Sequence, residues 1–326
     1  MYTLSELEAA HSLVREAIPP TPAIAWPLLA RRLGTEAIVK HENHNPTGAF
    51  KVRGGLTFVD ALMHRAPQTR ALVSATRGNH GQSLAFAARR AGIEPILFVP
   101  HGNSVEKNAA MRALGARVVE HGSDFQAARE EATRYSAAQG VELVPSFHRD
   151  LVRGVATYSF ELLRAHPDLD LLYVPIGQGS GICGGIAARD ALGLTTEIVG
   201  VQAEGAPAYA RSFVERRPVT TNQADTRADG MATRIPDAEA LEVIWKGASR
   251  IVLVSDDEIA EAVRAYWTDT HNLAEGAGAA PLAAAVREKA LVAGKKIGLV
   301  LSGGNIDFDL FQTWIAARDQ LGGVQP

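Results

Sequence analysis

Short apolar runs of four to six residues alternate with alanine-rich segments along almost the whole chain. The runs have the length and composition of buried strands, and the alanine-rich segments repeat apolar residues at helical spacing. This alternation is typical of βαβ units built around parallel sheets. It predicts strands at 36–40, 71–74, 95–99, 116–119, 171–176, 197–202, 251–254 and 296–301, and helices that open near residue 51 and cover 81–90, 105–114, 124–138 and 256–267.

We therefore predict an α/β fold of two doubly wound lobes with open, twisted, mainly parallel sheets. The large domain is expected at 1–52 and 146–326, and the small domain at 53–145. Ligands of such folds bind outside the carboxyl ends of the strands, so a cofactor is expected in the cleft between the lobes. The polar stretch Glu215–Pro236 lacks apolar periodicity and predicts a long functional or mobile loop.

Composition and charge exclude several classes of protein. The chain has 326 residues, with 33 Lys and Arg against 36 Asp and Glu, and no basic stripe that would make nucleic acid an expected partner. Its single cysteine, Cys183, excludes an internal disulfide framework and agrees with a reducing cytoplasm. No apolar run approaches the roughly 20 residues that cross a bilayer. The first 18 residues predict an amphipathic helix with a Ser5–Glu8 capping box rather than a signal peptide, so we expect a cytoplasmic protein without a membrane partner.

Candidate chemistry lies at four junctions between a strand and the following loop. The first, Asn45–Gly55, delivers Lys51 to the first turn of a helix beside Phe50. The helix dipole and burial both disfavour the charged ammonium there, which makes Lys51 a candidate amine nucleophile. The alternative is a lysine whose stem lies on apolar surface and whose charged head reaches water.

The second junction, Ser74–Gln82, passes from a strand through a tight turn into a helix. Backbone N–H groups at such a helix start suit a carboxylate, and Asn79 is placed to donate to a ligand oxygen. Alternatively, Gly78 and Asn79 serve only as turn and cap residues. The fourth junction ends a strand at Ser302, whose hydroxyl is suited to donate to a ring nitrogen without carrying charge or, alternatively, to cap the next segment.

The third junction is a glycine loop, Gly177-Gln178-Gly179-Ser180-Gly181, that follows a buried strand. Glycines let a phosphate approach the N–H groups and the helix dipole, so the loop predicts a phosphate site. Residues Gly179–Gly184 also satisfy the G-x-G-x-x-G pattern, with Glu204 lying 20 residues further on. This is the dinucleotide fingerprint, so a nicotinamide-dependent dehydrogenase is a rival hypothesis.

Taken together, the junctions supply the attachment points of pyridoxal phosphate. The amine suits its aldehyde, the asparagine its ring hydroxyl, the glycines its phosphate and the serine its ring nitrogen. A dehydrogenase explains only the glycine loop.

On these residues the chain resembles the threonine/serine dehydratase (ammonia-lyase) branch of the fold-type II, tryptophan synthase β-like pyridoxal-phosphate enzymes. The likeness runs from about Ile18 to Asn305 and includes the segment Gly48–Gly54, the loop Thr76–His80 and the pattern Val99-Pro100…Ser104…Lys107. It implies that Lys51 forms the Schiff base with pyridoxal 5'-phosphate and that the asparagine loop contacts the substrate carboxylate. A homodimer is an expectation from the same family.

The site residues expected from the junctions and from this resemblance fall into three groups. Lys51 and Ser302 are assigned to catalysis. The expected cofactor-binding residues are Phe50, Lys51, Asn79, Gly177, Gln178, Gly179, Ser180, Gly181, Gly230, Glu275 and Ser302. The expected substrate-binding residues are Ser74, Thr76, Arg77, Gly78, Asn79, His80 and Asp229.

The chain departs from the family pattern at informative positions. Arg77 stands where related serine racemases place a catalytic serine, so racemisation loses its expected second acid/base. An arginine there either recognises a second anionic or polar group on the substrate β-carbon or turns outward into solvent. Gln202 and Ala208 stand where cation-activated members carry acidic residues, and only Glu204 is acidic, so no metal site is predicted.

The predicted reaction is pyridoxal-phosphate-dependent β-elimination from a β-hydroxy α-amino acid of the threonine/serine type, giving a 2-oxo acid and ammonia. Lys51, with a pKa lowered by desolvation, would remove the α-proton. The neutral Ser302 hydroxyl makes the ring a weaker electron sink, which favours prompt loss of the β-group. The alternatives are an amino-acid racemase, a β-replacement lyase, a non-catalytic paralogue and, more distantly, an NAD-dependent dehydrogenase.

Overall fold

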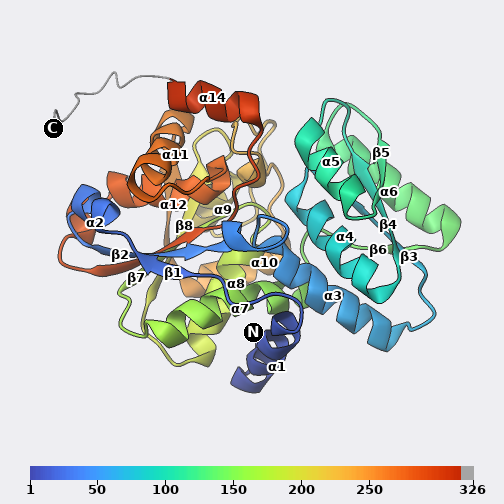
Figure 1. The fold of residues 1–326 in the computed structure, drawn as a ribbon, viewed down its shortest axis with the longest axis horizontal. Helices are drawn as coiled ribbons and strands as arrows, with labels where there is room; N and C mark the ends of the chain where they lie inside the picture. Colours follow the sequence, from blue (N-terminus) through green and yellow to red (C-terminus); the bar gives the residue numbers. More distant parts are fainter. Residues whose placement is uncertain (317–326) are drawn as a thin grey trace.

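The computed structural model describes residues 1–316, which form an α/β protein with two separate sheets (Figure 1). The larger sheet has six strands in the order β1-β2-β10-β7-β8-β9, and only β1 runs antiparallel to its neighbour. The smaller sheet has four parallel strands in the order β5-β4-β3-β6. The predicted fold class is therefore confirmed. The strands are β1 (Ala23–Ala25), β2 (Glu36–His41), β3 (Ala71–Ala75), β4 (Glu94–Val99), β5 (Arg117–Glu120), β6 (Glu142–Leu143), β7 (Leu171–Pro175), β8 (Glu197–Ala203), β9 (Ala248–Val254) and β10 (Lys296–Leu301).

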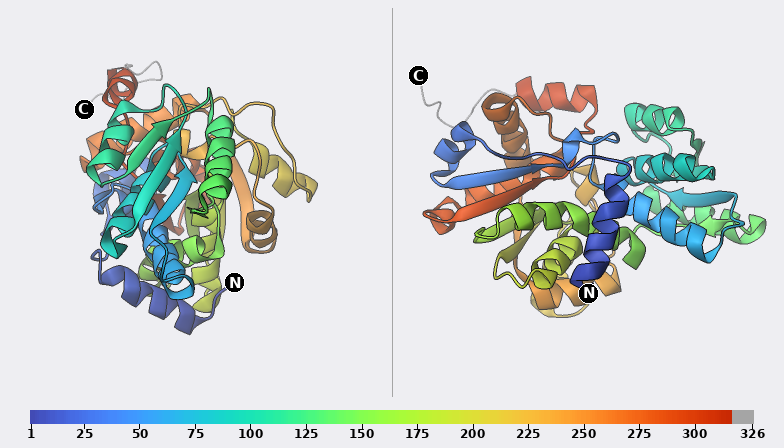
Figure 2. Two further views of the ribbon diagram at one scale, coloured as in Figure 1. Left: turned by 90° about the vertical axis from the view of Figure 1, so that its right-hand side faces the viewer. Right: turned by 60° about the horizontal axis from the view of Figure 1, so that its bottom comes forward.

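Helices cover the sheets and connect their parallel strands (Figures 1 and 2). None of the helices within residues 1–316 is long and apolar enough to span a membrane. The α-helices are α1 (Leu4–Arg15), α2 (Pro27–Leu33), α3 (Lys51–Arg65), α4 (Asn79–Ala91), α5 (Val105–Ala113), α6 (Phe125–Gln139), α7 (Arg149–Ala165), α8 (Ser180–Ala191), α9 (Ala208–Glu215), α10 (Ala238–Gly247), α11 (Asp256–Thr270), α12 (Gly276–Arg287), α13 (Lys289–Val292) and α14 (Phe308–Ala316); short 3-10 turns lie at η1 (Glu42–His44) and η2 (Asp229–Met231).

The large sheet lies between two apolar cores. Successive side chains of a strand point to opposite faces, so Tyr173 joins the core under α11 and α12, whereas Leu172 and Val174 join the core under α7 and α8. The small sheet repeats this arrangement, with Leu97 on the face of α4 and Ile96 on the face of α6. Burial on both faces explains why these strands read as continuous apolar runs in the sequence.

Two local features differ from the sequence expectations. The first helix has its capping box at Thr3 and Glu6, not at Ser5 and Glu8. Both pairs have the same spacing, and the helix begins at the earlier one because Tyr2 is buried and donates a hydrogen bond from its hydroxyl to Arg149 O at 2.6 Å. The short strands β1 and β6, which the apolar pattern did not predict, extend the two sheets at their edges.

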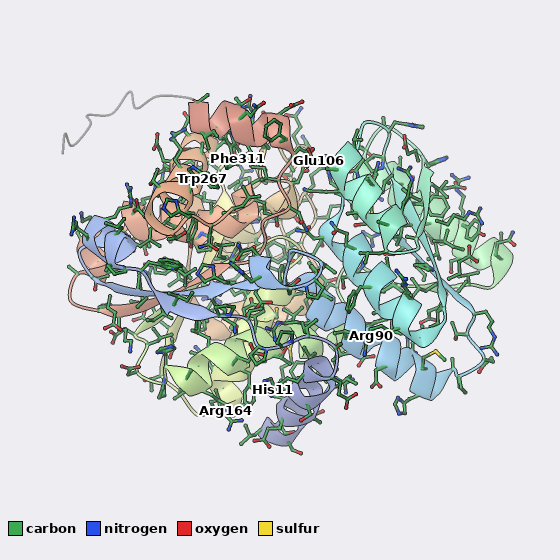
Figure 3. All side chains as sticks on the ribbon, in the orientation of Figure 1. His11, Arg90, Glu106, Arg164, Trp267 and Phe311 are labelled. Carbon is green, nitrogen blue, oxygen red and sulfur yellow. The ribbon has the colours of Figure 1, made fainter. Side chains whose placement is uncertain are left out.

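Helix α3 connects the two sheet units because it packs against α4 on one side and α7 on the other. At the opposite end of the interface, Glu106 of α5 accepts a hydrogen bond from Phe308 N of α14 at 3.0 Å (Figure 3). The strands of the small sheet all lie within residues 71–143. The division of the chain at residues 53 and 145 stays a prediction, because α3 belongs to the packing of both units.

A buried ion-pair network fixes α3 to the large sheet unit. Arg53 is fully buried and binds Glu42 with its Nε at 2.8 Å and Glu161 with its Nη1 at 2.8 Å. Lys40 of β2 binds the same Glu161 carboxylate at 2.6 Å. The hydroxyl of Thr157 accepts a further hydrogen bond from Arg53 at 3.0 Å. The network lies two residues along α3 from Lys51 and therefore fixes the helix turn that carries this lysine.

Candidate active site

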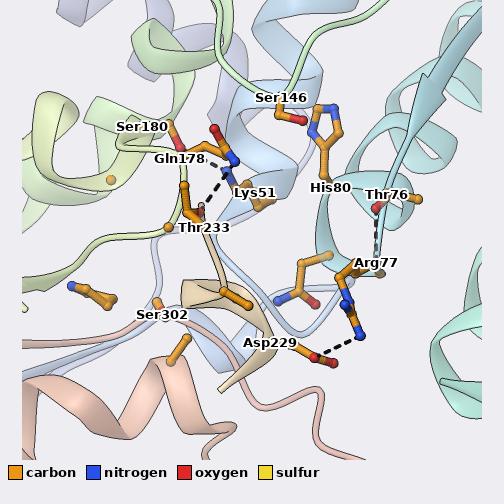
Figure 4. Close-up of a pocket in the computed structure, with 18 of the residues that line it drawn as sticks. Lys51, Thr76, Arg77, His80, Ser146, Gln178, Ser180, Asp229, Thr233 and Ser302 are labelled. Carbon is orange, nitrogen blue, oxygen red and sulfur yellow. Dashed lines mark hydrogen bonds and ion pairs between the residues drawn. The ribbon is translucent and has the colours of Figure 1, made fainter. Parts of the chain in front are cut away.

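A cavity lies between the two sheet units and collects residues from all four predicted junctions (Figure 4). The ends of β3, β7 and β10 and the start of α3 meet here, as expected for parallel strands whose carboxyl ends lie on one side of a sheet. The lining residues include all the predicted site residues except one: Phe50, Lys51, Thr76, Arg77, Gly78, Asn79, His80, Gly177, Gln178, Gly179, Ser180, Gly181, Asp229, Gly230, Glu275 and Ser302.

Ser74 is the predicted site residue that does not line the cavity. It lies within β3, is buried, and donates a hydrogen bond from its hydroxyl to Val144 O at 2.7 Å. Its side chain therefore connects β3 to the segment after β6 instead of facing a ligand. Thr76, in the same junction, lines the cavity, but its Oγ1 accepts hydrogen bonds from Gly78 N at 3.0 Å and Gly81 N at 2.9 Å, which fixes the turn.

Lys51 is a buried amine without an acidic partner among the residues that the structure describes. Its Nζ donates a hydrogen bond to Ser180 Oγ at 2.9 Å and lies 5.1 Å from the centre of the Phe50 ring. Burial lowers the pKa of Lys51 to about 8. His80 lies in the same cavity, and its buried Nε2 has no hydrogen-bond partner in the described chain. Burial and the positive charge of Lys51 lower the pKa of His80 to about 3, so this imidazole is neutral at pH 7.

The glycine loop after β7 is closed to side chains. A Cβ at Gly177 would lie 2.1 Å from Gly230 O, and a Cβ at Gly179 would lie 2.7 Å from the Ala240 Cβ. Gly179 also adopts a φ of +92°, in the left-handed region, and is the N-cap of α8. The first N–H groups of α8 therefore open toward the cavity, where they and the helix dipole favour an anion.

Asn79 is held by residues far from it in the sequence. Its Nδ2 donates to Glu275 Oε1 at 2.7 Å, and its Oδ1 accepts from Asn305 Nδ2 at 2.8 Å. Burial raises the pKa of Glu275, against the opposing effects of Lys107 and Asn79. Asn305 also donates to Thr47 O at 2.8 Å, which ties the β10 junction to the segment before Lys51. Ser302 is buried at the end of β10 and lines the same cavity (Figure 4).

Charged side chains lie on the side of the cavity away from Ser180 and Gln178 (Figure 4). Arg77 binds Asp229 with 3.3 Å between Nη2 and Oδ1. The amine of Lys107 lies 3.6 Å from Asp229 Oδ2 and 3.9 Å from Glu275 Oε2. Arg77 and Lys107 come from the small sheet unit and the two acids from the large one, so these ion pairs cross the cleft.

Sequence reasoning left several lining residues out of the predicted site. Lys107 belongs to the pattern after the strand that ends at Val99, and that pattern was the only signal for it. No local motif marks the others, which reach the cavity through the folding of distant segments. They are Phe125, Ser146, Thr233 and Ala277.

Two expectations from the rival hypotheses can be compared with the geometry. Glu204, the acid that a dinucleotide site requires, does not line the cavity and binds Arg287 at 2.9 Å instead. Gln202 is buried, and its side-chain oxygen accepts a hydrogen bond from Ala210 N at 2.8 Å. Within residues 1–316 there is no group of three or more His, Cys, Asp or Glu side chains placed to hold a metal ion.

The family model described as "Pyridoxal-phosphate dependent enzyme" matches residues 14–303. The chain belongs to this family. The predicted family and cofactor are thereby confirmed, and the enzyme can be compared with its relatives. It is similar to an L-threonine ammonia-lyase from Thermotoga maritima, with 32% identity over 95% of this chain and 77% of that protein. It is also similar to an L-threo-3-hydroxyaspartate ammonia-lyase from Saccharomyces cerevisiae, with 29% identity over 97% of each chain.

Solved structures give the same picture of the fold. A bacterial-type threonine deaminase structure, from the source abbreviated T.th., is 31% identical, with a TM-score of 0.87 over 94% of this chain and 99% of that chain. A pyridoxal 5'-phosphate-dependent aspartate racemase is 28% identical, with a TM-score of 0.90 over 94% of this chain and 97% of that chain. Lyases and racemases therefore share this architecture, and the fold alone does not choose the reaction.

The cavity of this pyridoxal-phosphate enzyme fits its cofactor. A buried amine of lowered pKa suits an aldehyde, and the glycine loop at the start of α8 suits a phosphate. The buried hydroxyl of Ser302 suits a ring nitrogen that is to stay uncharged. These features lie around one cavity, so a single ligand can reach them together.

Proposed function

We propose that the enzyme is an ammonia-lyase that eliminates the β-hydroxyl group from a β-hydroxy α-amino acid of the threonine/serine type. In the net reaction the Cα–H and Cβ–O bonds break, water leaves, and hydrolysis of the C–N bond yields a 2-oxo acid and ammonium. The observation that carries this proposal is the buried Lys51 amine beside the glycine loop, with the neutral Ser302 hydroxyl in the same cavity. The names of the similar ammonia-lyases support the same reaction.

Lys51 is the proposed catalytic base. Its Nζ takes the proton from the substrate Cα, for which the amine must first be neutral, and a pKa of about 8 makes a neutral amine accessible near physiological pH. When bound, pyridoxal phosphate supplies an electron sink that weakens the bonds to Cα. The Ser180 hydroxyl, 2.9 Å from Nζ, orients the amine as a hydrogen-bond acceptor.

The proposed cofactor-binding residues surround Lys51. Phe50 lies beside the amine, and the glycine loop from Gly177 to Gly181 presents N–H groups for the phosphate. Asn79 is held in place by Glu275 and donates toward the ring, while Ser302 faces the ring nitrogen. Gly230 closes the cradle, since its carbonyl lies where a side chain at Gly177 would be.

For the substrate, we propose that its carboxylate binds the start of α4, from Thr76 to His80, and that Arg77 and Asp229 face its β-substituent. Helix N-termini bind carboxylates through their free N–H groups. Arg77 lines the cavity and can exchange its Asp229 partner for an anionic or polar group.

Replacing Arg77 tests this assignment. We expect Arg77→Ala to lower kcat/KM for the preferred substrate about 10- to 100-fold, the magnitude of one charge-assisted hydrogen bond, and to change kcat/KM for L-serine far less. Steady-state assays on both substrates give the ratio. Equal losses on both would show that Arg77 has a structural role and does not select the β-substituent.

The similarity to an aspartate racemase makes racemisation the second candidate. A racemase needs a second acid/base on the opposite face of Cα. Arg77 stands at the expected position, and a guanidinium pairs with Asp229 and keeps its protons at neutral pH. Elimination requires only Lys51 and is therefore the better supported reaction.

The deciding experiment is an assay of the holoenzyme for 2-oxo acid and ammonia with serine, threonine, 3-hydroxyaspartate and phenylserine. We expect release with a marked preference for one substrate. No release from any of them, together with exchange of the Cα proton with solvent deuterium, would replace elimination by racemisation. β-Replacement would instead appear as a new amino acid when a thiol is added.

We further propose a cytoplasmic homodimer with a large domain at 1–52 and 146–326 and a small domain at 53–145. The single buried Cys183 is compatible with a reducing compartment. Light scattering tests the dimer. Limited proteolysis tests the domain boundaries, since cleavage is expected near residues 53 and 145 if they separate independent units.

A further inference from the structure

A second cavity adjoins the active-site cavity. The two share five lining residues, Arg77, Phe125, Gln178, Ala232 and Thr233, so only these side chains separate them. Figure 4 shows Gln178 and Thr233 across the pocket from Arg77, and Gln178 Nε2 donates to Thr233 Oγ1 at 3.4 Å. The other walls of the second cavity come from the start of α6 and from the loop before α10.

The second cavity is rich in positive charge. Arg77, Arg129 and Arg234 line it, and Asp124 is its one acidic residue. Asp124 is already used as the N-cap of α6, where its Oδ1 accepts a hydrogen bond from Ala127 N at 2.9 Å. The cavity therefore carries a net positive charge.

Two of these arginines have no partner. Arg77 binds Asp229, but the guanidinium groups of Arg129 and Arg234 make no ion pair or hydrogen bond with any residue from 1 to 316. Surface arginines in this chain usually do find an acid, as Arg65 and Arg287 show. Arg129 comes from α6 and Arg234 from the loop before α10, so two distant segments bring unpaired guanidinium groups to one cavity beside the active site.

We propose that the second cavity is a substrate subsite for an anionic group, a carboxylate or a phosphate, at the far end of the β-substituent. Guanidinium groups bind both anions through paired hydrogen bonds. Arg129 and Arg234 do not line the active-site cavity, so the anionic group must be separated from Cβ by at least one further carbon to reach them. This inference rests on the proposed elimination, whose substrate it defines: serine and threonine leave the subsite empty.

The test combines chain length with arginine removal. We expect the holoenzyme to release 2-oxo acid from 3-hydroxyglutamate, or from 2-amino-3-hydroxy-4-phosphonobutanoate, with a higher kcat/KM than from serine. The double variant Arg129→Ala/Arg234→Ala should lower that preference about 10- to 100-fold. The relative rates of the two long substrates tell a carboxylate subsite from a phosphate subsite.

Arg134→Ala is the matched control. Arg134 is exposed on the same helix and binds Glu131, but it does not line either cavity. This variant should keep the substrate preference of the wild type. A similar change of preference in Arg134→Ala would reduce the effect to general surface charge and overturn the subsite.

A binding measurement separates this inference from the proposed function. Glutamate has the skeleton of 3-hydroxyglutamate without the reacting hydroxyl, and norvaline has a similar size without the distal charge. Calorimetry should show glutamate binding the holoenzyme at least about 10-fold more tightly than norvaline, and the double variant should remove the difference. Serine turnover with equal binding of the two ligands would overturn the subsite alone. Arginine-dependent glutamate binding without turnover of any β-hydroxy amino acid would overturn the proposed elimination alone.

Discussion

Replacing Lys51 with alanine is expected to lower kcat by at least about 10³-fold, because the variant loses the amine that removes the Cα proton. The purified variant should also lose the near-visible absorbance of cofactor bound to a lysine amine, which borohydride bleaches in the wild type. No other lysine within residues 1–316 approaches the same environment: Lys107 lines the cavity beside Asp229 and Glu275, whereas Lys51 is buried without an acid. The assay for 2-oxo acid and the absorbance spectrum are the two measurements.

Lys107→Ala is the matched control for this prediction, since it also removes an amine from the cavity. It should keep the absorbance band, although its loss from the ion pairs across the cleft is expected to weaken turnover. A Lys51→Ala enzyme that keeps the band would place the cofactor on another lysine. Retention of the cofactor with normal turnover would contradict the whole assignment of the first junction.

The sequence could predict much of this site because each junction is a local event. A buried strand, a loop of special backbone conformation and a helix start lie within about ten residues of one another, so Lys51, Asn79, Gly179 and Ser302 can be recognised without knowing the fold. Parallel strands then bring their ends to one side of a sheet.

The rest depends on contacts between distant segments. Asn305 holds Asn79 across 226 residues, and Glu275 reaches it across 196, which no periodicity can show. Ser74 was misplaced for the same reason, because its partner, Val144, lies 70 residues away on the neighbouring edge of the small sheet. The partner of Arg77, Asp229, lies in a stretch whose only sequence signal was a lack of pattern.

The second large effect is expected on stability, from Arg53→Met. Arg53 is fully buried and neutralises the carboxylates of Glu42 and Glu161, so its loss leaves buried negative charge with too few partners. Removing one member of a buried ion pair costs about 3–5 kcal/mol of unfolding free energy. Arg65→Met is the control on the same helix: Arg65 is half exposed and binds Glu142 at 2.7 Å, so its loss should cost less than about 1 kcal/mol. Urea unfolding of the three proteins measures both values.

The pH dependence of this destabilisation follows from Glu161. Burial alone would raise the pKa of Glu161, but the hydrogen bond from His11 and the charge of Arg53 outweigh it and hold that pKa well below its usual range. A carboxyl whose pKa is lower in the folded state stabilises the fold above its unfolded pKa of about 4.3, and this stabilisation is lost as the pH falls. The difference in stability between the wild type and Arg53→Met should therefore be largest above about pH 5 and narrow toward pH 3. A difference that stays constant over this range would mean that the variant loses packing around the guanidinium and not its charge.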